Sequence, residues 1–105
     1  MNEYFTYNPR LKIYLPKLDQ DWNSYSLHTQ NSILADWEHI RGHIPDRIAE
    51  LEEDINLKQE ALNEEENFLT SCELTEEISE LASIINDLWI WYRSNQQISK
   101  DKVHT

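Results

Sequence analysis

The sequence has little glycine, proline or cysteine: one Gly, three Pro and one Cys occur among 105 residues. Scarcity of turn-forming residues disfavours a fold of many short strands and favours a few long elements. The single cysteine, Cys72, excludes an intrachain disulfide, so we expect a reducing compartment. A chain of this length forms one domain with a modest hydrophobic core.

Long apolar runs are absent too. The longest, LWIWY at residues 88–92, is far shorter than the roughly 20 residues that a membrane-spanning helix needs. Residues 1–11, MNEYFTYNPRL, contain no apolar segment of the kind that directs secretion. The sequence therefore predicts a cytoplasmic protein that does not contact a membrane.

Positive charge is scarce, with 9 Lys and Arg against 20 Asp and Glu, so the formal net charge is −11. Residues 46–87 hold fourteen acidic and two basic residues, a local net charge of −12. This charge repels nucleic-acid backbones and anionic membranes, so we expect no direct nucleic-acid binding. A basic protein partner is compatible with it. A solvated helical surface explains the same charge without any partner.

Aromatic residues are plentiful, with four Trp, five Tyr and two Phe, and several lie in residues 71–95. Apolar residues in this segment recur at alternating steps of four and three, which predicts a helix and not a strand. The repeating positions are Leu74, Ile78, Leu81, Ile85, Leu88 and Tyr92. Trp89 lies about 60° to one side of this stripe and Trp91 about 100° to the other, so one neighbouring helix cannot cover both.

Two further helices are predicted before it, at residues 23–41 and 45–67. Gly42 is a candidate left-handed C-cap for the first, and Pro45 suits the first turn of the second. The alternative is a single helix kinked at this joint. The candidate N-caps are Asp21, Asn23 and Ser24 for the first helix, and a capping box of Thr70 and Glu73 for the last.

Residues 1–18 differ from the rest of the chain. Leu11, Ile13 and Leu15 alternate with other residues, and flanking prolines disfavour a helix. We expect an extended arm with one short strand, packed on the helices of its own chain or on a second chain. The predicted fold is therefore all-α: a small helical bundle built on an antiparallel helical hairpin, with an extended N-terminal arm, a three-helix domain at 19–97 and a flexible tail at 98–105.

Three groups of residues are candidate chemical sites. Asp36, His39 and His43 are spaced for one side of a straight helix, but Gly42 and Pro45 are expected to end that helix, so solvated side chains explain them better than a metal. The acidic residues near 64–77 lack the environments that separate catalytic carboxylates, and like charges beside Cys72 oppose a reactive thiolate. We therefore predict no metal, no cofactor and no enzymatic activity.

A candidate protein interface remains. A helix that buries Ile85 and Leu88 must place Ile90 outside, and Leu57 is outward on the preceding helix by the same reasoning. Trp89, Ile90 and Arg93 together have the composition of a binding hot spot, whereas Trp37, Trp91 and Tyr92 are expected to be core. No motif indicates a particular family.

Two functions follow from these features. The first is a small regulatory or adaptor protein that binds another protein through the aromatic helix face and self-associates, as a dimer. The alternative is an acidic nucleic-acid mimic that occupies the basic groove of a DNA- or RNA-binding protein.

Overall fold

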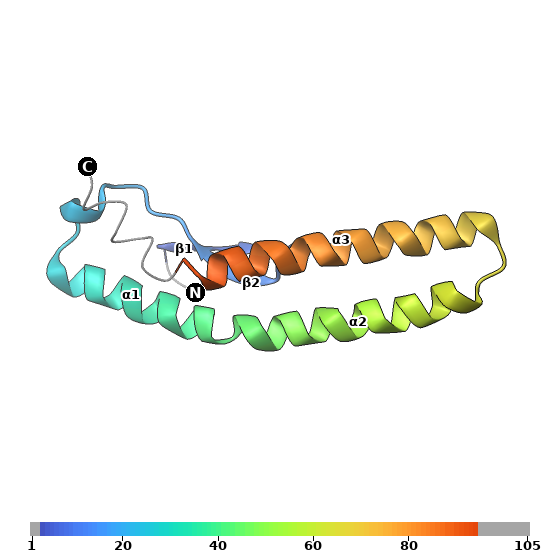
Figure 1. Cartoon of the computed structure of the whole chain (residues 1–105). Helices are drawn as coiled ribbons and strands as arrows, with labels where there is room; N and C mark the ends of the chain where they lie inside the picture. Colours follow the sequence, from blue (N-terminus) through green and yellow to red (C-terminus); the bar gives the residue numbers. More distant parts are fainter. Residues whose placement is uncertain (1–2, 95–105) are drawn as a thin grey trace.

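The computed structural model describes residues 3–94, which form a long helical hairpin with a small β-hairpin at one end (Figure 1). The elements are β1 (Phe5–Asn8), β2 (Ile13–Pro16), a short 3-10 turn (Trp22–Ser24), α1 (Leu27–Gly42), α2 (Ile44–Glu64) and α3 (Phe68–Tyr92). α1 and α2 together form one bent helix of 38 residues, and α3 packs antiparallel to it. The predicted antiparallel helical hairpin is confirmed. The predicted flexible tail lies outside the described residues.

The joint between α1 and α2 is a bend and not a loop. His43 separates the two helices with right-handed helical angles, φ −92° and ψ −7°. Its N–H donates to Ile40 O (3.1 Å), and the N–H of Arg47 donates to His43 O (3.2 Å). Gly42 has no positive φ, so the predicted left-handed cap is wrong. Pro45 does lie in the first turn of α2, where its missing N–H is tolerated, and the kinked-helix alternative describes the joint best.

The helix starts differ from the predicted ones by a few residues. α1 is capped by Ser26, whose hydroxyl accepts from the N–H of Thr29 (3.1 Å), whereas Asp21 makes no side-chain cap. α3 is capped by Asn67, whose Oδ1 accepts from the N–H of Thr70 (3.1 Å). The predicted capping box at Thr70 is therefore wrong by one helical turn, because asparagine is as good an N-cap as threonine.

The N-terminal segment is a β-hairpin within the chain, so the expectation of a single strand without a partner is wrong. β1 and β2 pair antiparallel with Tyr7 opposite Tyr14. In the turn, Asn8 Oδ1 accepts from the N–H of Leu11 (2.9 Å), and Lys12 adopts a left-handed φ of 62°. Phe5 is buried, whereas Tyr7, two residues further along the same face of β1, is exposed and packs edge-on against Tyr14 at 5.2 Å.

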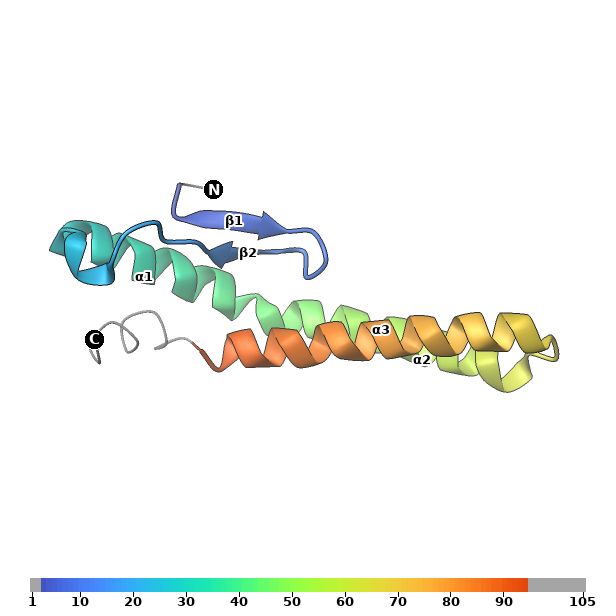
Figure 2. The same ribbon diagram turned by 90° about the horizontal axis from the view of Figure 1, so that it is seen from above.

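Arg10, in the turn of the β-hairpin, fixes it against α3. Its guanidinium donates to Glu80 Oε1 (3.0 Å), Ser83 Oγ (2.9 Å) and Asp87 Oδ2 (2.7 Å), which share one face of α3. On α2, Arg47 donates to Leu11 O (3.3 Å). The β-hairpin therefore lies on one side of the pair formed by α2 and α3, and only beside its end next to α1 (Figure 2).

The buried core lies at this covered end. Trp37 is at its centre, and the indole ring of Trp91 meets it edge-on at 5.8 Å. The buried hydrophobic residues are Phe5, Leu11, Ile13, Trp22, Ile33, Trp37, Ile40, Ile44, Ile48, Leu51, Ile84 and Leu88. Among described residues 52–83 none is buried, so the core ends where the β-hairpin ends.

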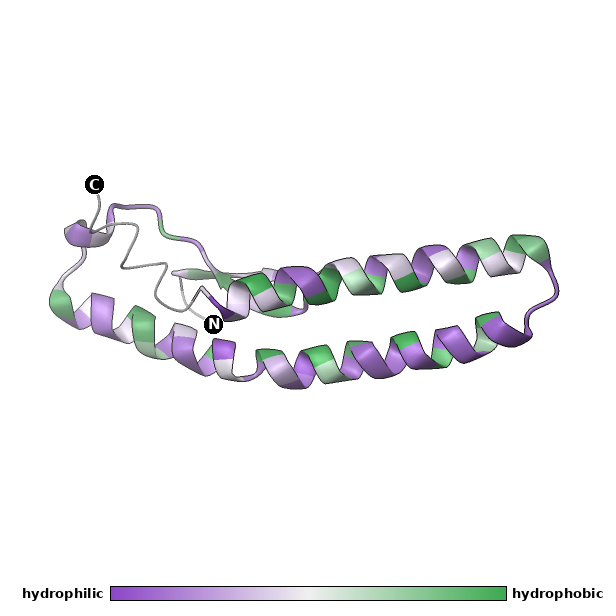
Figure 3. Ribbon diagram, in the orientation of Figure 1, coloured by the Kyte–Doolittle hydropathy of each residue, from purple (hydrophilic) through white to green (hydrophobic). Residues whose placement is uncertain are grey.

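The remaining part of α2 and α3 extends away from the core, and no other element of the described chain lies over it (Figure 2). Apolar residues face each other across them, and hydrophilic residues predominate on the outer surface of α2 (Figure 3). The molecule measures 60 × 23 × 22 Å, and its radius of gyration is 18.1 Å. A compact chain of about 100 residues would have a radius of gyration of about 13 Å. The fold is therefore elongated, with a core at one end.

Trp37 gives a test of this core. We expect Trp37→Ala to lower the free energy of unfolding by about 3–5 kcal/mol, because it removes the largest buried side chain. Trp37 Nε1 is buried and has no hydrogen-bond partner among the described residues, so Trp37→Phe removes an unsatisfied polar group and costs less. Urea denaturation followed by circular dichroism measures both. Equal losses for the two variants would contradict this account.

Candidate functional site

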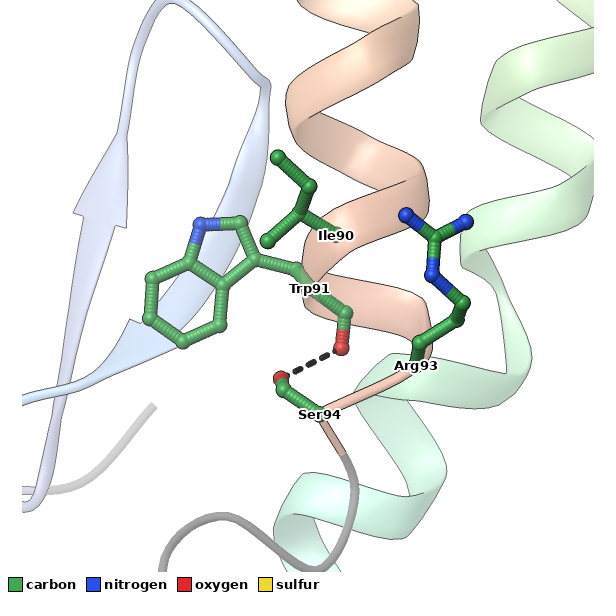
Figure 4. A pocket seen from close by; sticks show the side chains of 4 residues that line it. All are labelled: Ile90, Trp91, Arg93 and Ser94. Carbon is green, nitrogen blue, oxygen red and sulfur yellow. Dashed lines mark hydrogen bonds between the residues drawn. The ribbon is translucent and has the colours of Figure 1, made fainter.

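The C-terminal end of α3 brings together three of the four residues that the sequence indicates as an interface. Trp89 is 36% exposed and Ile90 50% exposed, and Arg93 is exposed beside them. Ile90, Trp91, Arg93 and Ser94 line a surface pocket, in which Trp91 points toward the β-hairpin and Arg93 extends from the opposite side of α3 (Figure 4). We call Trp89, Ile90 and Arg93 the end patch.

The two tryptophans of α3 face different neighbours, as their helical positions predict. Trp91 packs on Trp37 of α1, so α1 covers this side of the stripe. Trp89 packs edge-on against Tyr92 at 5.5 Å and stays partly in solvent. Leu88, between them, is fully buried. One side of the predicted wide stripe is thus covered within the chain, and the side that carries Trp89 is left open by the described residues.

Arg41 fixes the position of Tyr92, the aromatic side chain on which Trp89 packs. Its guanidinium lies over the ring of Tyr92, 4.8 Å from the ring centroid, and donates to Tyr92 O (3.1 Å) at the end of α3. Glu38 orients the guanidinium by accepting from Nη2 (2.6 Å) and Nε (3.2 Å). A cation at the C-terminus of a helix, stacked on an aromatic ring, is favourable on both counts. The end patch therefore rests on a fixed side-chain arrangement.

This arrangement predicts a pKa change in a variant. The hydrogen bond from Arg41 lowers the pKa of Glu38, so the pair stabilises the folded state above the ordinary carboxyl pKa. That stabilisation is lost as the pH falls through the lowered pKa of the folded state. In Arg41→Gln the pKa of Glu38 should rise toward the ordinary glutamate value, measured by NMR titration of the side-chain carboxyl. An unchanged pKa would contradict the contact.

Leu57, the fourth predicted interface residue, does not belong to the end patch. It is exposed on α2, as its helical position predicts. The neighbouring Lys58 pairs with Glu77 of α3 (2.8 Å), which fixes the level of Leu57 along the hairpin. Ile90 lies thirteen residues further along α3 than Glu77. This separation is about 20 Å at 1.5 Å per residue. Leu57 and Ile90 therefore lie on separate surfaces.

The exposed start of α3 was missed by sequence reasoning. Phe68 is 77% exposed and Leu69 is 70% exposed, at the far end of the hairpin. The sequence predicts helices at residues 45–67 and 71–95, which leaves Phe68 and Leu69 between them. Together with Cys72, Phe68 lines a second surface pocket at this end. The available signal was the asparagine at position 67, which starts α3 one turn earlier.

A groove between α2 and α3 was missed as well. It is lined by Glu52, Ile55 and Asn56 from α2 and by Ala82 and Ile85 from α3. Periodicity alone could not reveal it, because apolar residues recur at the same spacing whether or not a further element covers the contact between α2 and α3. We call this surface the seam groove.

Negative charge is concentrated in the part of the hairpin beyond the core. Residues 51–81 hold eleven acidic residues and one basic residue, Lys58, a net charge of −10. The hydrogen bond from Lys58 to Glu77 raises the pKa of Lys58 and joins α2 to α3 inside this acidic segment. Lys58 and Glu77 thus form an ion pair across the two helices.

The two histidines that are candidate metal ligands, His39 and His43, lie side by side. The rings of His39 and His43 meet edge-on at 4.9 Å. Within residues 3–94, no group of three His, Cys, Asp or Glu side chains is placed to hold a metal ion. In the same part of the chain, no helix is both long enough and apolar enough to cross a membrane.

Comparison with protein-family models, with curated proteins and with solved structures finds no match to this chain.

Proposed function

We propose that this chain is a small regulatory or adaptor protein without catalytic activity, which binds another protein through the end patch and self-associates as a dimer. The observation that supports this proposal is the exposure of Trp89 and Ile90, adjacent large apolar residues, beside Arg93. Tryptophan and arginine are the residue types most enriched among those that dominate binding energy.

The fixed position of Tyr92 favours binding. Trp89 packs on Tyr92, and Tyr92 is held by the guanidinium of Arg41. A side chain that is already fixed loses less conformational entropy when a partner covers it. The end patch is therefore suited to contact and is more than an isolated exposed residue.

Self-association uses the same surface. In a dimer with two-fold symmetry, each copy contributes the same patch, so both copies bury Trp89 and Ile90 together. The end patch also lies away from residues 51–81, which carry most of the negative charge. Repulsion between two copies is therefore smaller here than at the far end of the hairpin.

The acidic segment supports the second candidate function, a nucleic-acid mimic. A net charge of −10 on 31 residues, 51–81, is compatible with binding in the basic groove of a DNA- or RNA-binding protein. Such binding depends on charge, so its affinity falls steeply with salt and does not require Ile90.

Ile90→Asp tests the first function. The substitution places a charge in the end patch, and we expect it to weaken dimerisation at least about tenfold. Leu27→Asp is the matched control, because Leu27 is 72% exposed and lies at the N-terminal end of α1, whereas the C-terminal end of α1 is the one near the end patch. Sedimentation equilibrium across a concentration series measures the dissociation constant. A wild-type chain that stays monomeric, or an Ile90→Asp dimer as tight as wild type, would refute the proposed dimer.

A further inference from the structure

The part of the hairpin beyond the core has an apolar seam that its own two helices leave half exposed. Each apolar residue of this seam is partly buried, whereas its counterparts in the core are buried. The seam residues are Ile55, Leu62, Leu74, Ile78 and Leu81. In a bundle of three or more helices, a further helix covers residues at such positions. The seam is therefore built like the interior of a bundle that lacks one member.

The seam groove opens on the side away from the β-hairpin. Arg10 of the β-hairpin contacts Glu80 and Ser83 on α3. Ala82 lies about 100° around the helix from Ser83 and about 160° from Glu80, so it faces the other way. In Figure 2 the β-hairpin lies on one side of the helix pair, and no other helix or strand of residues 3–94 lies over the opposite side. Nothing among the described elements fills this groove.

The charge around the groove selects its occupant. Glu52 lines the groove, and residues 51–81 carry a net charge of −10. A second copy would bring the same negative segment against it, and like charges in contact cost free energy. A helix with Lys and Arg on its polar face binds more favourably for two reasons: its apolar face covers the seam, and its cations lie near the carboxylates.

We infer that the seam groove binds a basic amphipathic helix of a partner protein. From Glu52 to Glu64 the uncovered part of α2 is about 18 Å long, which matches a helix of about 13 residues. Apolar residues of the partner at positions i, i+3, i+4 and i+7 pack on Ile55, Ala82 and Ile85, and its Lys and Arg residues lie beside Glu52 at the α2 edge. This surface is distinct from the end patch and does not depend on the proposed dimer.

A synthetic peptide tests the inference. The probe has Leu at heptad positions a and d and Lys at the other positions, labelled for fluorescence anisotropy. We expect it to bind the wild-type chain with an affinity that falls as salt is raised. Two control peptides separate the causes: the same residues in scrambled order lack an apolar face, and a Leu and Glu version reverses the charge. Equal binding of the scrambled peptide, or no binding of the probe, would overturn the inference.

Matched variants locate the binding site. Ala82→Arg fills the groove, and Ala61→Arg adds the same charge to an exposed position of α2 that lies about 120° around the helix from Ile55. We expect Ala82→Arg to weaken probe binding at least about tenfold and Ala61→Arg to change it by less than about twofold. Circular dichroism checks that both variants keep their helix content. Equal losses for the two variants would show that charge alone attracts the probe, and would overturn the groove as its site.

Ile90→Asp separates this inference from the proposed function. We expect this variant to bind the probe like wild type, even where it no longer dimerises. If the wild-type chain forms a dimer that survives Ile90→Asp and is lost in Ala82→Arg, a second copy is the occupant of the groove. That result would overturn the basic helix as its partner.

Discussion

The packing of α3 against the bent helix depends on a third layer of structure. Two helices in contact bury only the residues between them, and a closed core needs further cover. Here α1 and the β-hairpin supply that cover, with Trp37 and Arg10 as the main contacts to α3. Where the cover ends, near Leu51 and Ile84, burial ends too. The molecule therefore has a buried end, where a third layer covers the helix pair, and an open end, where α2 and α3 have no such cover among the described elements.

Both candidate surfaces arise where the described elements leave the helices uncovered. At the covered end, α1 contacts Trp91 but leaves Trp89 exposed. The end patch is therefore the part of the apolar stripe of α3 that α1 and α2 do not cover. At the open end, no element of residues 3–94 lies over the seam as a third layer, and acidic side chains keep the exposed helices hydrated. We propose the first surface for an apolar contact between copies and the second for a basic partner.

Periodicity in the sequence was enough to predict the antiparallel helices and the exposed positions of Ile90 and Leu57, because helical geometry fixes which residues share a face. It did not predict β1, which pairs with β2 across a turn closed by the side chain of Asn8 and contacts α3 through Arg10. It also placed the start of α3 at Thr70, since Asn67 and Thr70 are both good caps and the sequence does not rank them. The seam groove was not predictable from the sequence. The spacing of apolar residues along two helices is the same whether or not a third layer covers them.

Amide hydrogen exchange of the free chain under native conditions tests the central claim most directly. If stability follows the third layer, amides near Leu62 and Leu74 should exchange at least about tenfold faster than amides near Ile48 and Leu88, through local opening of the uncovered hairpin. Equal protection along the whole of α2 and α3 would show that two helices alone are sufficient, and would contradict the account.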